Sequence, residues 1–133
     1  MSKKILIVSS NYYSDVSKGL ESGATELLKE SGFRFEIINA PGCFEIPYLI
    51  KKNLDNYDGF IALGCVIKGD TYHFEVIANE TSRKIMDVSV DNQVPIGFGI
   101  LTCFNIEQAI IRSDIQQENK GREAALACIE LLK

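Results

Sequence analysis

The chain has 133 residues, of which 46% are hydrophobic and 24% charged, so its size and composition predict one globular domain over residues 1–133. Its 14 Lys and Arg residues stand against 18 Asp and Glu residues, and the net charge of −4 argues against a nucleic-acid-binding surface but not against a small anion held by local donors. No segment reaches the ~18 apolar residues that a bilayer span needs, and the start MSKKILIVSSN lacks the features of a signal peptide, so we expect a cytoplasmic protein with no membrane partner.

The first half of the chain alternates short apolar runs with helical periodicity. KILIVSS (4–10) is a β-branched run, typical of a strand that is buried on both faces. A helix that ends at Gly32 follows, indicated by the spacing of Val16, Leu20, Ala24, Leu27 and Leu28. FRFEIINA (33–40) alternates like a second strand, and CFEIPYLIKKNL (43–54) predicts a short helix with Pro47 in its first turn.

The second half repeats this alternation. YDGFIALGCVI (57–67) and VPIGFGILT (94–102) predict a third and a fourth strand. Between them, a long amphipathic helix over 72–90 is indicated by Phe74, Ile77, Ala78, Thr81, Ile85 and Val88. Asn105 and Gln108 resemble a capping box that opens a helix through Arg112. A last helix over 121–133 has an inner stripe of Ala125, Cys128, Ile129 and Leu132.

The resulting order, βαβαβαβαα, predicts an α/β fold. We expect a three-layer α/β/α sandwich with a flavodoxin-like four-stranded parallel sheet and right-handed crossovers. Ligands of such sheets bind beyond the carboxyl ends of the strands, where the strand order reverses. The loops that this rule selects are 10–14, 41–45, 65–72 and 98–104.

The loop 65–72 joins a strand to the long helix. The first N–H groups of a helix lack internal partners and carry the positive end of its dipole, which suits a bound anion. Gly69 lets the backbone approach a ligand closely, and Lys68 adds charge, whereas the carboxylate of Asp70 either repels an anion or caps the helix. A capped helix start and a phosphate site both stay open here.

His73, the only histidine of the chain, lies at the start of the same helix. Imidazole exchanges protons near neutral pH, and the positive helix end favours its neutral form, which accepts a proton. A proton-transfer role and a plain surface role are both compatible with this position.

The other candidates are individually weaker. Glu45, near a helix start, either accepts hydrogen bonds from hydroxyl groups or compensates the helix dipole. Tyr12 offers an aromatic ring for stacking on a flat heterocycle, although SNYYS is a poor phosphate loop and so weakens the interpretation as a flavin carrier. Taken alone, Arg112 and Lys120 are ordinary residues of a helix end and a turn.

The four cysteines are Cys43, Cys65, Cys103 and Cys128, and none of them form a CxxC pair. We interpret them as buried thiols of a reducing compartment. With one histidine and scattered cysteines, we expect no metal site.

Five stretches, from about Ile5 to Leu132, resemble the 6,7-dimethyl-8-ribityllumazine synthase family, the penultimate enzymes of riboflavin synthesis. They are PGCFEIP (41–47), GCVIKGDTYHFE (64–75), PIGFGILT (95–102), IEQAIIRSD (106–114) and NKGREAALACIE (119–130). The resemblance implies condensation of 5-amino-6-(D-ribitylamino)uracil with 3,4-dihydroxy-2-butanone 4-phosphate, with loss of phosphate and water. It further implies no cofactor and an active site between the subunits of a homopentamer.

The resemblance also implies roles for individual residues. Tyr12 matches an aromatic residue that stacks on the pyrimidine, where the family more often has Phe or Trp. Glu45 is expected to hold the ribityl hydroxyls, and His73 to transfer the proton. The remaining substrate contacts are expected from Cys43, Phe44, Cys65, Val66, Ile67, Gly69, Asp70 and Thr71 of one subunit, with Phe98, Arg112 and Lys120 of the next.

The alternatives that we weighed are an archaeal-type riboflavin synthase, a non-catalytic lumazine- or flavin-binding protein and a structural shell protein. The family's sixty-subunit capsids usually carry an extra N-terminal strand and a glycine-rich turn before the last helix. This chain begins close to its first strand, and its turn reads SDIQQENKG, so we expect a free pentamer.

Overall fold

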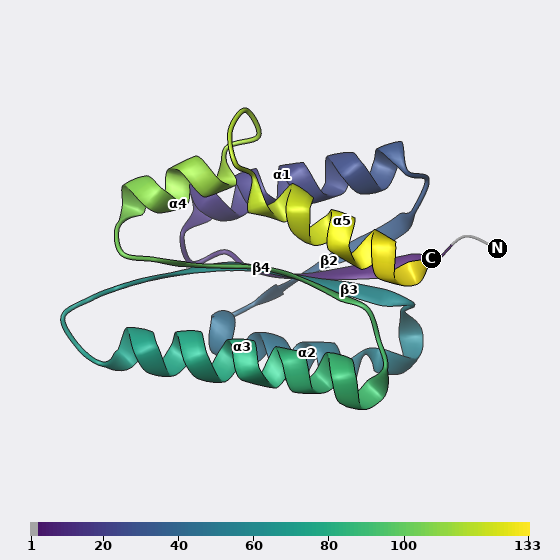
Figure 1. Cartoon of the computed structure of the whole chain (residues 1–133), viewed down its shortest axis with the longest axis horizontal. Coiled ribbons are helices and arrows are strands. Elements are labelled where there is room, and N and C mark those ends of the chain that lie inside the picture. Colours follow the sequence, from purple (N-terminus) through teal and green to yellow (C-terminus); the bar gives the residue numbers. More distant parts are fainter. Residues whose placement is uncertain (1–2) are drawn as a thin grey trace.

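Parallel strands form one sheet in the order β2-β1-β3-β4. In the computed structural model, which describes residues 3–133, they are β1 (Lys4–Ser10), β2 (Arg34–Ala40), β3 (Gly59–Ile67) and β4 (Ile96–Cys103) (Figure 1). β1 lies between β2 and β3, paired from Lys4↔Arg34 on one side and from Ile5↔Gly59 on the other. The predicted sheet and its strand content are therefore confirmed.

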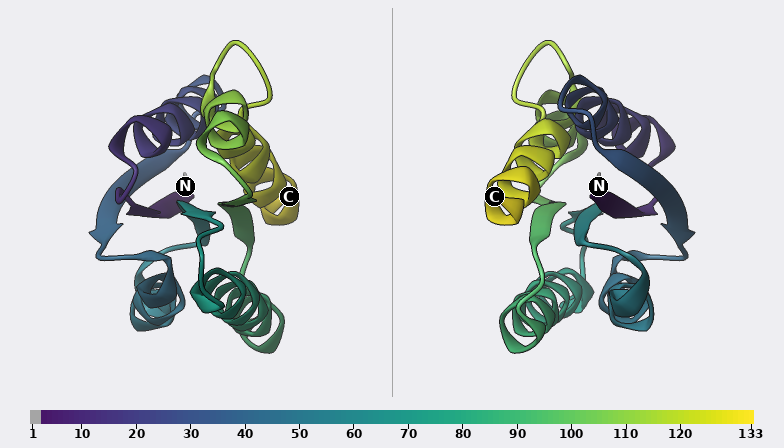
Figure 2. Two further views of the ribbon diagram at one scale, coloured as in Figure 1. Left: turned by 90° about the vertical axis from the view of Figure 1, so that its left-hand side faces the viewer. Right: turned by 90° about the vertical axis from the view of Figure 1, so that its right-hand side faces the viewer.

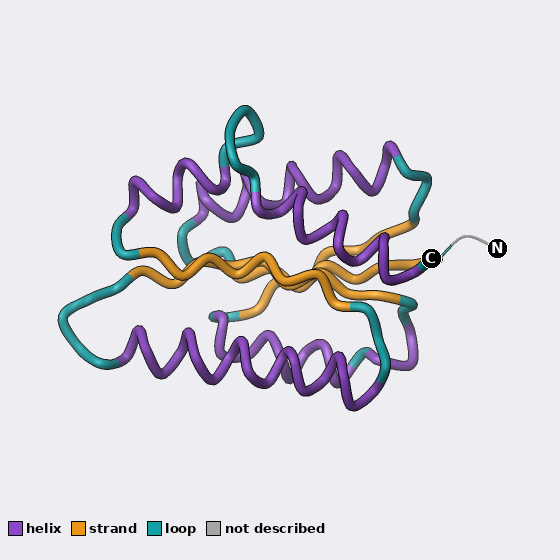
Figure 3. Tube along the Cα trace, viewed as in Figure 1, coloured by secondary structure: helices purple, strands orange, loops and turns teal. Residues whose placement is uncertain are grey.

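Helices cover both faces of this sheet (Figures 1 and 2). One face carries α1 (Ser14–Glu30), α4 (Ile106–Ser113) and α5 (Lys120–Leu132). The opposite face carries α2 (Ile46–Lys52) and α3 (His73–Asn92). Figure 3 shows the sheet as the middle layer of three, so the expected α/β/α sandwich is confirmed.

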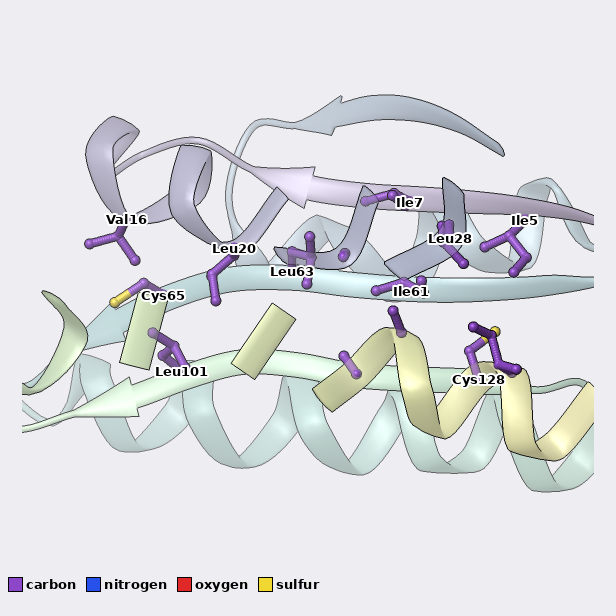
Figure 4. Packing of buried hydrophobic residues seen from close by; sticks show 14 of the residues in the cluster. Ile5, Ile7, Val16, Leu20, Leu28, Ile61, Leu63, Cys65, Leu101 and Cys128 are labelled. Atoms are coloured by element: carbon purple, nitrogen blue, oxygen red, sulfur yellow. The ribbon is translucent and has the colours of Figure 1, made fainter. Parts of the chain in front are cut away.

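The core is divided by the sheet into two apolar layers. Ile5 and Ile7 of β1 pack toward α1 and α5, whereas Leu6 and Val8 of the same strand pack toward α2 and α3. Figure 4 shows the first of these layers, where side chains of α1 and α5 meet those of β1 and β3. β1 is thus buried on both faces, as its unbroken apolar run predicts.

The helix boundaries follow local signals closely. Gly32 adopts a φ of 78° after α1, the left-handed conformation that glycine accepts without strain. Asn105 caps α4 as predicted, because its Oδ1 accepts a hydrogen bond from Gln108 N at 2.9 Å. The reciprocal bond reaches one residue further back than a capping box requires, since Gln108 Oε1 accepts from Phe104 N at 2.8 Å.

The segment predicted as one helix over 43–54 is divided in three. A 3₁₀ turn at Cys43–Glu45 leads into α2, and a second 3₁₀ turn follows at Leu54–Asn56. Pro47 lies in the first turn of α2, where its missing N–H costs no hydrogen bond. This arrangement leaves Glu45 at the helix start, as expected.

All four cysteines are buried and carry free thiols. None of the helices in residues 3–133 combines the length and the hydropathy that crossing a membrane requires.

Candidate active site

A cavity of about 680 Å³ lies at the carboxyl ends of β1 and β3. These neighbouring strands continue into helices on opposite faces of the sheet, α1 after β1 and α3 after β3, so the chain diverges at this point. The cavity is lined by Ser10, Tyr12, Tyr13, Gly42, Cys43, Phe44, Glu45, Cys65, Val66, Ile67, His73, Val76 and Ile77. Three of the four loops that the sequence selects therefore meet around one space.

His73 is the first residue of α3 and is exposed toward this cavity. Val76 and Ile77 line the cavity with it, because residues three and four positions apart share one face of a helix. The sequence analysis named His73 as a site residue but named Ile77 only for its place in the helix pattern, and it did not name Val76. Their helical spacing from His73 was the signal that could have identified them.

The start of α3 has no side-chain cap. The suggestion that Asp70 caps this helix is therefore wrong. The nearest approach is made by Thr71, whose Oγ1 accepts a long, 3.4 Å hydrogen bond from His73 N. The residues from Lys68 to His73 are exposed, and they lie at the positive end of the helix dipole.

Lys68 links the connection before α3 both to β4 and to α3 itself. Its backbone N–H donates to Cys103 O at 2.9 Å, which joins the ends of β3 and β4. Its ammonium contacts Glu75 Oε2 at 2.7 Å, and this hydrogen bond lowers the pKa of Glu75. Lys68 thus holds the loop over 69–72 to both neighbouring elements, while the residues of the loop itself are exposed.

Aromatic rings of the loops after β1 and β2 form another part of the cavity wall. Tyr12 is 77% exposed, and its ring meets that of Tyr13 edge-on with centroids 5.0 Å apart. Phe44 is also more than half exposed at the cavity. Tyr13, which the sequence analysis did not name, is partly buried, and this burial raises its pKa. Exposed ring faces at a cavity suit a flat heterocyclic ligand.

Two thiols form part of the cavity floor. Cys43 and Cys65 are 6% and 8% exposed, and both line the cavity. Burial raises the pKa of Cys43 to about 11 and that of Cys65 to about 12, and the nearby thiol of Cys103 contributes to the second value. These sulfurs are therefore neutral at physiological pH and act as packing groups.

The predicted residues Phe98, Arg112 and Lys120 do not line this cavity. Phe98 is 45% exposed on the edge strand β4. Arg112 lies in the last turn of α4, where its Nη1 donates to Gln108 O at 3.2 Å, and Lys120 opens α5, where its Nζ contacts Glu123 Oε1 at 3.2 Å. The cavity of one chain thus lacks the three residues that the resemblance assigns to an adjacent subunit.

Gly69, Asp70 and Thr71 are not part of the lining either, but they belong to the exposed loop that leads into His73. Over residues 3–133, no group of three or more His, Cys, Asp and Glu side chains has the arrangement of a metal site.

The chain was compared with known proteins. The family model of 6,7-dimethyl-8-ribityllumazine synthase matches residues 2–133. The chain belongs to the 6,7-dimethyl-8-ribityllumazine synthase family.

Curated relatives of that name are similar over almost their whole length. The protein of Zymomonas mobilis is 46% identical over 96% of this chain and 93% of its own length. The proteins of Agrobacterium fabrum and Novosphingobium aromaticivorans are 45% and 46% identical, each over 97% of this chain and 94% of their own. The resemblance seen in the sequence is confirmed, and the alternatives of a riboflavin synthase or a binding protein are not favoured.

We predict that the buried thiol of Cys65 makes folding stability depend on alkaline pH. An unfolded thiol loses its proton near pH 9, whereas the folded one holds it to about pH 12, so its stabilising contribution is complete below pH 9 and declines above it. Urea unfolding of the wild type and of Cys65→Ala should show their difference in unfolding free energy shrinking by about 1–2 kcal/mol between pH 8 and pH 10.5.

Cys128→Ala is a second test of the same effect at a different place in the core. Its thiol is buried away from the cavity and also has a pKa of about 12, so the same trend is expected. A difference that stays constant with pH in both variants would show that the thiols titrate normally in the folded protein.

Proposed function

We propose that the protein is a transferase of riboflavin biosynthesis that condenses 5-amino-6-(D-ribitylamino)uracil with 3,4-dihydroxy-2-butanone 4-phosphate to give 6,7-dimethyl-8-ribityllumazine. The observation that carries the proposal is the cavity between the ends of β1 and β3, where an exposed imidazole stands at an uncapped helix start. Membership of the lumazine synthase family supports the choice of reaction.

In this proposal, the pyrimidine lies between Tyr12 and the end of β3. Cys65, Val66 and Ile67 line that side, and the strand end offers backbone groups for hydrogen bonds to the ring. Glu45, at the start of α2, accepts hydrogen bonds from the ribityl hydroxyls. The wall between ring and polyol is supplied by Cys43 and Phe44.

The phosphate group lies at the loop before α3. Gly69, Asp70 and Thr71 are exposed there, and in this proposal their N–H groups and the Thr71 hydroxyl donate to the phosphate. Asp70 is exposed, so its carboxylate can remain in water and away from the anion. His73 is close by in sequence and lines the cavity, which places a base beside the phosphate-bearing substrate.

The reaction needs proton transfer more than strong electrophilic activation. The ring amine attacks the ketone, and loss of water gives an imine. A proton then leaves carbon and the C–O bond to phosphate breaks, so the bonding electrons depart with phosphate. The ribitylamino nitrogen then attacks the remaining carbonyl carbon, and loss of a second water closes the ring. His73 accepts the proton, while the helix start and the Arg112 guanidinium stabilise the anion. Holding both substrates together supplies much of the acceleration.

We propose a homopentamer in which adjacent protomers complete each site. Phe98, Arg112 and Lys120 lie outside the cavity of their own chain, and in this arrangement they reach the cavity of the neighbour. A groove of about 650 Å³ between α2 and α3 shares Phe44 with that cavity and exposes Tyr48, which offers an apolar surface for such a contact. A single domain and a cytoplasmic location, which suits four free thiols, are part of this proposal.

We predict that His73→Ala slows product formation without abolishing it. Loss of a general base costs about 100-fold in kcat, but the two substrates are still held together. The measurement is lumazine absorbance after the two substrates are mixed with each variant. His73→Asn, which keeps a polar side chain but cannot take the proton, should be equally slow.

Wild-type activity in both variants would remove His73 from the mechanism. The wild-type protein with lumazine alone serves as the second arm of the same assay. Formation of riboflavin in that arm, without condensation of the two substrates, would contradict the proposed function.

We predict that sedimentation finds free pentamers. The turn before α5 has no glycine between Ser113 and Gly121, and it is ordered by Asp114, whose Oδ1 accepts from Gln116 N at 2.8 Å. This turn differs from the glycine-rich turn expected in sixty-subunit capsids. A species near sixty subunits would contradict the prediction, and a monomer that is active at assay concentration would contradict the shared site.

A further inference from the structure

The side chain of Asn119 lies at the junction of α4 and α5 and is only 6% exposed. Its Oδ1 accepts a hydrogen bond from Arg122 N at 2.8 Å and so caps α5. Its Nδ2 donates to Ser113 O at 2.8 Å and to Gly19 O at 2.9 Å. A buried amide that uses both ends on backbone groups is fixed in orientation.

These partners come from three helices. Ser113 ends α4, Arg122 lies in the first turn of α5, and Gly19 lies in α1. The connection between α4 and α5 is an exposed turn, in which Gln117 N donates to Asp114 O at 3.0 Å. Asn119 is thus the buried link by which α4, α5 and α1 are held at one point.

The helix α1 has glycine at the two positions where Ser113 and Asn119 approach it. A Cβ atom at Gly19 would lie 2.2 Å from Ser113 O, and one at Gly23 would lie 2.0 Å from Asn119 Oδ1. Neither distance is compatible with a side chain. Both glycines therefore allow the end of α4 and the Asn119 amide to approach the backbone of α1.

The residues next to this link are the two cations of the proposed site. Arg112 directly precedes Ser113, whose carbonyl accepts from Asn119, and Lys120 directly follows Asn119. Each cation contacts an acceptor of its own helix, Gln108 O for Arg112 and Glu123 Oε1 for Lys120. The direction in which each of these side chains projects from the surface therefore depends on the placement of α4 and α5.

We propose that Asn119 is a positioning residue of the reaction. It fixes α4 against α5 and so sets the spacing at which Arg112 and Lys120 meet the substrates in the cavity of the adjacent protomer. This inference rests on the proposed function, in which both cations act across the subunit boundary. A displacement of about 1 Å in such groups is enough to lower the rate by one to two orders of magnitude.

Asn119→Ser separates this role from helix capping. Serine is a good N-cap and keeps the acceptor for Arg122 N, but it is too short to replace the two donor bonds to Ser113 and Gly19. Asn119→Ala loses the cap as well. Asn53→Ala is the matched control, because the Asn53 amide donates to Leu49 O at 2.7 Å at the end of α2, outside the cavity lining.

The two-substrate assay is run below the melting temperature of the least stable variant. Asn119→Ser and Asn119→Ala should each lower kcat/KM for the butanone phosphate about 10-fold, chiefly by raising the KM of this substrate. Asn53→Ala should lower the melting temperature and leave kcat/KM within about twofold. In an Arg112→Ala/Lys120→Ala background, Asn119→Ser should change kcat/KM less than about twofold, because the groups that it positions are absent.

Two results would overturn the inference alone: wild-type kcat/KM in Asn119→Ser, or an undiminished effect of this substitution in the Arg112→Ala/Lys120→Ala background. Wild-type kcat/KM in Arg112→Ala/Lys120→Ala would instead overturn the proposed roles of the two cations, and the inference with them.

Discussion

The position of β1 between β2 and β3 is the constraint on which the site depends. All three strands are parallel, so their carboxyl ends lie at one edge of the sheet. The chain leaves β1 toward α1 on one face and leaves β3 toward α3 on the other. The cavity, the exposed start of α3 and the aromatic wall at Tyr12 all follow from this divergence.

In the proposed function, a weakly acidic chain holds an anionic substrate at this edge because the relevant charges are local. The N-cap residue of α3, Tyr72, makes no side-chain capping bond, and Lys68, paired with Glu75, holds the exposed loop before the helix. The net charge of −4 is a sum over the whole chain, and exposed charges are screened by salt, whereas dipoles at a helix start act over a few ångströms. In the proposed site, donor geometry rather than net charge therefore decides where the phosphate lies.

Local signals in the sequence were enough to predict the sheet and most of the cavity. The unbroken apolar run of β1, Gly32 after α1 and Asn105 before α4 each have a backbone or burial requirement that a single stretch of sequence reveals. Cavity residues at strand ends could be found for the same reason. Capping by Asp70, one of two alternatives that the sequence left open, does not occur, because a carboxylate before a helix is a compositional signal whereas the bond depends on the loop geometry.

Other features depend on contacts between distant segments. The link made by Asn119 joins residues about one hundred positions apart, since its amide donates to Gly19 O with a separation of 100 residues, and no local pattern announces it. Phe98, Arg112 and Lys120 lie outside the cavity of their own chain, so neither local sequence nor the geometry of one protomer can assign them a partner. Their place in the cavity of an adjacent protomer is proposed from the family resemblance.

The central claim, that each site is shared by two protomers, is tested most directly by mixing inactive chains. His73→Ala and Arg112→Ala are refolded together in equal amounts, so that about a quarter of the subunit boundaries pair an intact His73 with an intact Arg112. The account predicts that the mixture makes lumazine faster than either variant refolded alone. A rate equal to the mean of the two separate variants would show that both residues act, if at all, within one chain.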